Sequence, residues 1–133
     1  MKLYADEPGS RAVRKAVSDS ELITSHLIAY TETRTALARK HRREELPDHR
    51  FTELKQAFER DWNTIHRLPV NETTVRRAGD LAEQYGLRAY DSIHLTAAEA
   101  LHAALSVTVT FACFDNQLIQ AAGHLGLELL EAG

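Results

Sequence analysis

Three acidic residues stand where a parallel α/β fold gathers its functional groups. Asp115 follows a β-branched run over 106–113, Asp91 lies at the start of the predicted helix before that run, and Glu32 lies about two turns into an earlier helix. Ligands of parallel sheets bind beyond the carboxyl ends of the strands, where loops and helix N-termini converge. If the three carboxylates meet, their mutual repulsion favours a hard divalent ion such as Mg²⁺ or Mn²⁺ between them.

Each of these residues also has a purely structural interpretation. Asp91 could cap a helix, Glu32 could face solvent, and Asp115 could be a turn residue. The chain has 19 acidic residues, so some fall in suggestive places by chance. Spacing alone therefore leaves the metal site and the structural interpretation both open.

Strands that alternate with helices are predicted to position these carboxylates, and their separations argue for a mostly parallel sheet covered by helices. Apolar residues surround most of the helix that carries Glu32, which predicts a central helix buried on several sides. The predicted order is a strand at 21–24, a helix over 25–43 capped by Ser25, a helix after Pro47, a possible strand at 65–70, a helix from the Asn71 cap to Gly86, a helix from Tyr90 or Asp91 to Leu105, a strand at 106–113, a short helix ending at Gly123 and a last possible strand at 127–132.

Length and composition limit the class of protein. The chain of 133 residues fits one domain over 1–133, and 44% hydrophobic with 26% charged residues is typical of a folded globular chain. With 16 Lys and Arg against 19 Asp and Glu, the net charge of −3 excludes a polycation. Apolar runs too short for a bilayer, a beginning without a signal peptide and the lone Cys113 predict a cytoplasmic protein without a membrane role.

Positive charge is concentrated in one segment. Arg34, Arg39, Lys40, Arg42 and Arg43 place five positive charges within ten residues, which predicts a local groove for nucleic-acid phosphates, with Arg34, Arg39 and Lys40 as its first candidates. The alternative is a solvated helix end, where basic side chains complement the helix dipole.

Other reactive or aromatic side chains are expected to pack in the interior. His94, one turn after Asp91, is predicted to be a hydrogen-bonded core histidine, and Cys113 a buried thiol with no catalytic part. Phe51, Phe58 and Trp62 recur at helical spacing and predict a core or a dimer face. The histidines and the single cysteine form no zinc-binding pattern.

Four segments, in order and at their separations, resemble the PIN-domain family, specifically the VapC-type toxins of toxin–antitoxin pairs. The segments are KLYADEPGS, TSHLIAYTETRTALAR, GLRAYDSIHLTAA and TFACFDNQL, of which AYDSIHLTAA is the most specific. The resemblance spans nearly the whole chain.

This resemblance implies a three-layer α/β/α sandwich with a mostly parallel sheet and an endoribonuclease that uses Mg²⁺ or Mn²⁺. By matching motif, Glu32, Asp91 and Asp115 are the implied metal ligands and catalytic residues. The implied partners are an RNA substrate, a cognate VapB-like antitoxin and a second copy in a homodimer.

The chain departs from the family pattern at its start. Family members usually begin with a strand ending in Asp before the segment that matches residues 2–4, whereas Met1 stands in the middle of that pattern here. The first strand and first acidic ligand are thus expected to be missing, because the natural protein begins upstream or because the chain is impaired. An impaired domain would bind RNA or a protein without cutting. A carboxylate-metal phosphatase is a further alternative, but no nucleophilic Asp follows an early strand.

Overall fold

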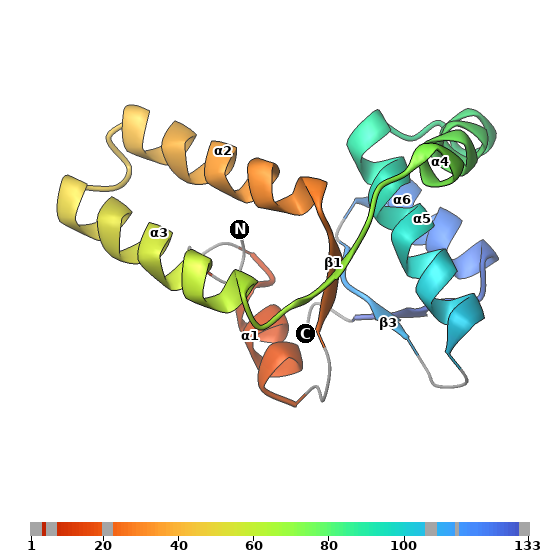
Figure 1. Cartoon of the computed structure of the whole chain (residues 1–133), viewed down its shortest axis with the longest axis horizontal. Helices are drawn as coiled ribbons and strands as arrows, with labels where there is room; N and C mark the ends of the chain where they lie inside the picture. The colour runs from red at the N-terminus through yellow and green to blue at the C-terminus, as the bar shows by residue number, and fades with distance from the viewer. Residues whose placement is uncertain (1–3, 5–7, 20–22, 106–108, 114, 131–133) are drawn as a thin grey trace.

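The computed structural model describes residues 4, 8–19, 23–105, 109–113 and 115–130. Helices and short strands alternate along the chain (Figure 1). The elements are α1 (Ser10–Asp19), β1 (Thr24–His26), α2 (Ile28–Arg42), α3 (Asp48–Trp62), β2 (His66–Leu68), α4 (Glu72–Tyr85), α5 (Ala89–Ala104), β3 (Thr110–Phe111), α6 (Asn116–His124) and β4 (Glu128–Leu129).

The strands form two parallel pairs. In one pair β1 lies beside β2, with Ser25 opposite Arg67, and in the other β3 lies beside β4, with Phe111 opposite Leu129. Within the described residues, β1 and β3 each pair with one strand only. Figure 1 shows β1 between the hairpin of α2 and α3 on one side and the group of α4, α5 and α6 on the other. Parallel strand pairs flanked by helices agree with the expected α/β sandwich.

A compact apolar core joins α4, α5, α6, β3 and β4. Leu81, Leu95 and Ala121 are fully buried there, and Phe111 and Leu118 are each only 3% exposed. The helix boundaries follow the predicted caps, because the Asn71 side chain accepts a hydrogen bond from the Thr74 N–H at 3.0 Å and Gly86 takes the left-handed conformation at φ 67°. This core supports the ends of α5 and α6 that carry Asp91 and Asp115.

The hairpin of α2 and α3 has a smaller, aromatic core. Leu37, Leu54, Phe58 and Trp62 are buried, and the Phe58 and Trp62 ring centroids lie 5.9 Å apart. The amphipathic pattern after Pro47 thus predicted a real interior face, in which Phe58 and Trp62 belong to the core, whereas Phe51 is only partly buried. No described helix combines the length and the apolar character needed to cross a membrane.

The prediction that the helix carrying Glu32 is buried on several sides is wrong. In the described chain Leu37 is its one buried residue, while Ile28 is 38% exposed and the preceding Leu27 is 50% exposed. The reason is that α2 packs against α3 and β1 as one arm of a projecting hairpin (Figure 1), so its remaining surface faces solvent.

Two predicted boundaries also need correction. Ser25 does not cap a helix, because it lies within β1 and α2 begins three residues later after Leu27, which makes no side-chain cap bond. Parallel pairing with β2 extends the strand past the expected end, and the Leu27 N–H still bonds the Leu68 carbonyl at 3.1 Å. The strand expected over 106–113 is seen only at Thr110–Phe111, with 106–108 outside the described residues.

Candidate functional site

Three different helices carry the predicted acidic residues. Glu32 is the fifth residue of α2 and is exposed, slightly more than one turn from the helix start. Asp91 lies in the first turn of α5, and Asp115 is the N-cap of α6. Asp91 and Asp115 are therefore held at helix N-termini, where the backbone dipole favours negative charge.

Glu32 and Asp91 are close enough for their charges to interact. Partial burial raises the pKa of Glu32, the interaction with the Tyr90 hydroxyl lowers it, and the negative charge of Asp91 raises it again. The pKa of Tyr90 is also raised, chiefly by its burial and then by the charge of Glu32. Tyr90 of α5 thus stabilises the Glu32 carboxylate, whereas the neighbouring Asp91 repels it.

Asp91 is less exposed than the other two candidates. Its side chain is 17% exposed and accepts a hydrogen bond from Arg88 Nε at 3.2 Å. The Arg88 side chain is 83% exposed, so this ion pair is solvated and easily opened. The Asp91 carboxylate at the N-terminus of α5 is therefore available to bind another ligand.

Asp115 also has a structural role. Its Oδ1 accepts a hydrogen bond from the Leu118 N–H at 3.1 Å, which caps α6. The pKa of the buried Cys113 thiol is raised to about 11 by burial and then by the charges of Asp115 and Asp91. Both aspartates thus act on the same thiol, and the expectation that Cys113 is a buried, unreactive packing residue agrees with this environment.

The three carboxylates are suitable ligands for a divalent metal ion, but in the structure, which describes all three, they do not lie close enough together to hold one. Carboxylate oxygens are the ligands that Mg²⁺ and Mn²⁺ prefer, and a cation would relieve the repulsion between Glu32 and Asp91. Across the described part of the chain, no three His, Cys, Asp or Glu side chains gather closely enough to hold a metal ion. The charge of Asp91 acts on Glu32, and the charges of Asp91 and Asp115 both act on the Cys113 thiol.

The side chains of His26, Tyr90 and His94 form a cluster next to Asp91, and only His94 was singled out from the sequence. His94 was predicted to lie in the core, and burial lowers its pKa while the Ala112 backbone partly offsets this. Tyr90 and His26 were missed. The one available signal for Tyr90 was its place directly before Asp91, whereas the contact of His26 with α5 joins residues far apart in the chain.

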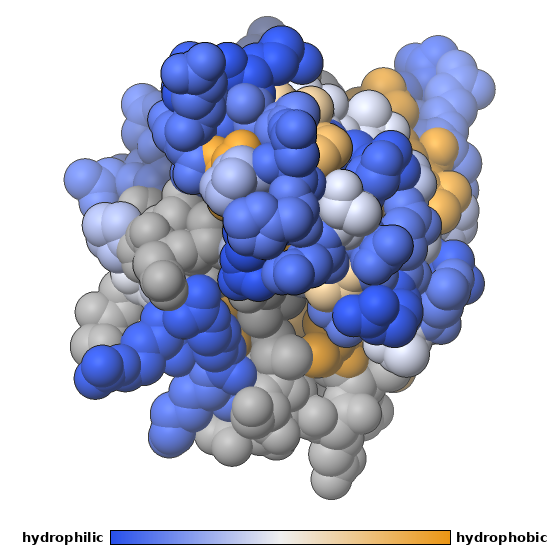
Figure 2. Space-filling view, turned by 90° about the vertical axis from the view of Figure 1, so that its left-hand side faces the viewer, coloured by the Kyte–Doolittle hydropathy of each residue, from blue (hydrophilic) through white to orange (hydrophobic). Residues whose placement is uncertain are grey.

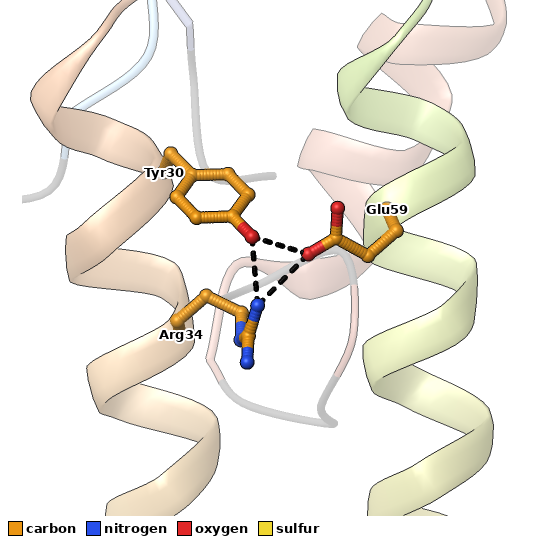
Figure 3. A network of polar contacts seen from close by, with 3 residues as sticks. All are labelled: Tyr30, Arg34 and Glu59. Atoms are coloured by element: carbon orange, nitrogen blue, oxygen red, sulfur yellow. Dashed lines mark hydrogen bonds and ion pairs between the residues drawn. The ribbon is translucent and has the colours of Figure 1, made fainter.

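The basic candidates on α2 do not share one role. Figure 3 shows Arg34 turned toward α3, where its Nη1 lies 2.7 Å from the Tyr30 hydroxyl and 2.9 Å from Glu59 Oε1. The Tyr30 hydroxyl donates to the same Glu59 oxygen at 2.5 Å. Because Arg34 follows Glu32 by two residues, the two side chains leave opposite sides of the helix.

Arg39 and Lys40 are placed differently from Arg34. Arg39 is exposed and, seven residues after Glu32, lies on the same side of α2. Lys40 lines a cleft of about 260 Å³ together with Arg14 and Arg50, and its Nζ lies 3.5 Å from Glu45 Oε2. The end of the hairpin that faces the viewer in Figure 2 is covered mainly by hydrophilic residues.

Comparisons with known proteins agree with the motif resemblance. Residues 1–123 match the PIN domain, a range that contains all three acidic candidates. Similar proteins include Ribonuclease VapC45 of Mycobacterium tuberculosis strain CDC 1551 / Oshkosh and Ribonuclease VapC49 of strain ATCC 25618 / H37Rv. Each is 29% identical over 101 residues, which are 76% of this chain and 70% of the relative. With the fold and the carboxylate positions described above, the match shows that the chain belongs to the PIN-domain family, among relatives of the VapC type.

Proposed function

We propose that this chain is a VapC-like endoribonuclease that depends on Mg²⁺ or Mn²⁺ and uses Glu32, Asp91 and Asp115 as its metal-binding and catalytic residues. The observation that carries the proposal is the match of residues 1–123 to the PIN domain, together with Asp91 in the first turn of α5 and Asp115 at the N-cap of α6. The negative charge of Asp91 also contributes to the raised pKa of Glu32, and a divalent cation would relieve this repulsion. Ribonuclease relatives support the choice of RNA as substrate.

The chain's own residues would divide the work at this site. When bound, the divalent ion lowers the pKa of water and neutralises charge that develops on the phosphate. Asp91 and Asp115, fixed at helix N-termini, are the proposed ligands, and Glu32 ligates or accepts a proton from the attacking water. Tyr90, whose hydroxyl interacts with the Glu32 carboxyl, is proposed to orient it.

RNA binding is proposed for Arg39 and Lys40, with Arg39 the stronger candidate because the Lys40 ammonium also pairs with Glu45. Arg39 shares the exposed side of α2 with Glu32, and Lys40 lines the cleft together with two arginines. Arg34 remains a candidate from the sequence, but its guanidinium is engaged with Tyr30 and Glu59. An arginine in that network positions α2 against α3 and has little freedom to contact phosphates.

The direct test is cleavage of an RNA by the purified chain with Mg²⁺, with Mn²⁺ or with a chelator. Glu32→Gln, Asp91→Asn and Asp115→Asn should each abolish metal-dependent cleavage. Asparagine is itself a good N-cap, so the Asp115 variant keeps α6 capped and isolates the loss of charge. Asp80→Asn, an exposed acid on α4, is the matched control. Unchanged cleavage in the three site variants would refute the assignment.

A second candidate function is RNA or protein binding without cleavage. It is favoured by the finding that, in the part of the chain with described coordinates, no three potential ligands gather as a metal site requires. The same assay separates the two proposals when RNA binding is measured alongside cleavage. Binding without metal-dependent products in the wild-type chain would favour this second function.

Assembly and location are also proposals. We expect a homodimer and inhibition by a VapB-like antitoxin, as the family resemblance implies, and a cytoplasmic location. Exposed apolar side chains at Leu27, Ile28 and Val75 are available for contact with a second chain. Light scattering after size exclusion would test the dimer, and a cleavage assay with the antitoxin added would test the inhibition.

A further inference from the structure

We infer that His26 is a positioning residue that acts through Tyr90 to hold the carboxyl of Glu32 in place. This inference rests on the proposed function. His26 is the last residue of β1, and in the sequence the beginning of α2 separates it from Glu32.

The environment of His26 is unfavourable for an imidazole. The residue is 0% exposed at the end of β1, and among the residues that the structure describes neither ring nitrogen has a hydrogen-bond partner. Burying a polar group without a partner costs free energy, whereas an apolar side chain of similar size would avoid that cost. Such departures from favourable packing are expected at functional sites.

The His26 ring contacts two rings of α5 close to Asp91. Its centroid lies 5.4 Å from that of Tyr90 and 5.6 Å from that of His94, distances typical of interacting aromatic pairs. The Tyr90 and His94 rings are stacked, with centroids 6.4 Å apart and an angle of 11° between the planes. His26 therefore closes a cluster of three rings in which β1 supports one turn of α5.

Tyr90 extends this cluster to the proposed site. Its hydroxyl interacts with the Glu32 carboxyl, which contributes to the raised pKa of Tyr90, and the next residue is Asp91. His94, on the far side of the cluster, packs against Phe111 of β3 with ring centroids 4.7 Å apart. The cluster thus connects β1 and β3 next to Asp91. A shift of the His26 ring would be transmitted to Glu32 through Tyr90.

The test replaces His26 by leucine and by phenylalanine. His26→Leu removes the ring and its nitrogens while keeping an apolar side chain of similar size. We expect an equal or higher melting temperature, an unchanged KM and a kcat reduced by about tenfold or more, since small misplacement of a reacting group is costly. His26→Phe, which keeps a ring against Tyr90, should restore part of kcat. A leucine variant that cleaves RNA like the wild type, or that melts at a clearly lower temperature, would overturn the inference.

A cycle with Tyr90→Phe shows whether His26 acts through Tyr90. The effects of His26→Leu and Tyr90→Phe on kcat and on the free energy of unfolding should be non-additive, because the His26 ring packs against the tyrosine ring and so positions the hydroxyl that Tyr90→Phe removes. His66→Phe, at an exposed histidine of the neighbouring strand β2, is the control and should be additive with Tyr90→Phe. The unfolding measurements need no activity, so they test this contact even if the chain does not cleave RNA. Additive effects for His26 and Tyr90 would refute it.

Discussion

The two sides of the molecule hold the proposed site by different means. On one side α4, α5 and α6 surround a dense apolar core and present Asp91 and Asp115 at helix N-termini. On the other, α2 projects with α3, buries little of its own surface and carries Glu32. The difference shows that two acids are fixed by core packing, whereas the third depends on aromatic and polar contacts at the base of a hairpin.

The largest effect on stability is expected in the apolar core. Leu95→Ala should lower the free energy of unfolding by about 2–5 kcal/mol, because Leu95 is fully buried and the truncation leaves a cavity. The comparison variant is Ile28→Ala in α2, where the side chain is 38% exposed and the loss should stay within about 1 kcal/mol. Chemical denaturation measures both. Equal losses would remove the contrast between the two sides.

A smaller effect is expected from the polar network of the hairpin. Glu59→Gln removes the charge that pairs with Arg34 and weakens the acceptor for the Tyr30 hydroxyl (Figure 3). The melting temperature should fall by less than in Leu95→Ala, because these groups are partly solvated. High salt should reduce the difference between Glu59→Gln and the wild type. A salt-independent difference would mean that the network acts by packing and not by charge.

The third prediction concerns the pH dependence of stability. The pKa of Glu32 is raised above its ordinary value of 4.5, mainly by burial, with Tyr90 opposing and Asp91 adding to the shift. The folded chain then binds more protons than the unfolded chain, so this residue makes the free energy of unfolding fall as pH rises above 4.5. Glu32→Gln should remove that decrease. Identical pH profiles for the variant and the wild type would contradict the assigned environment.

The smallest predicted change separates two arginines of α2. Arg39→Gln should reduce the salt dependence of RNA binding by about one unit of slope, the share of roughly one phosphate contact. Arg34→Gln should leave this slope unchanged, since the Arg34 side chain is committed to Tyr30 and Glu59. Fluorescence anisotropy in a chelator, over a range of salt, measures both. The opposite result would place the RNA on the α3 side of the hairpin.

Local signals in the sequence were sufficient for much of the fold. The Asn71 cap, the Gly86 stop and the apolar spacing before Trp62 each depend on neighbours within one or two turns, and the structure has all three. The end of β1 was misjudged because it is set by pairing with β2, forty-two residues further on at Ser25 and Arg67. Long-range pairing leaves little trace in local propensity.

The sequence selected the residues of the proposed site but gave no information on their arrangement. Motif matching selected the acids, and the structure brings Glu32 near Asp91. The exposure of α2 depends on how a helical hairpin leaves the sheet, and the support from Tyr90 and His26 joins β1 to α5. Neither follows from residue spacing, because both arise from contacts between elements that are distant in the sequence.

Binding of Mn²⁺ measured by calorimetry tests the central claim most directly, because it requires no RNA. If Glu32, Asp91 and Asp115 form one metal site, the wild-type chain binds the ion, each of Glu32→Gln, Asp91→Asn and Asp115→Asn weakens binding by more than about tenfold, and Asp80→Asn leaves it unchanged. Wild-type affinity in all three site variants would contradict the claim that these carboxylates hold a metal ion together.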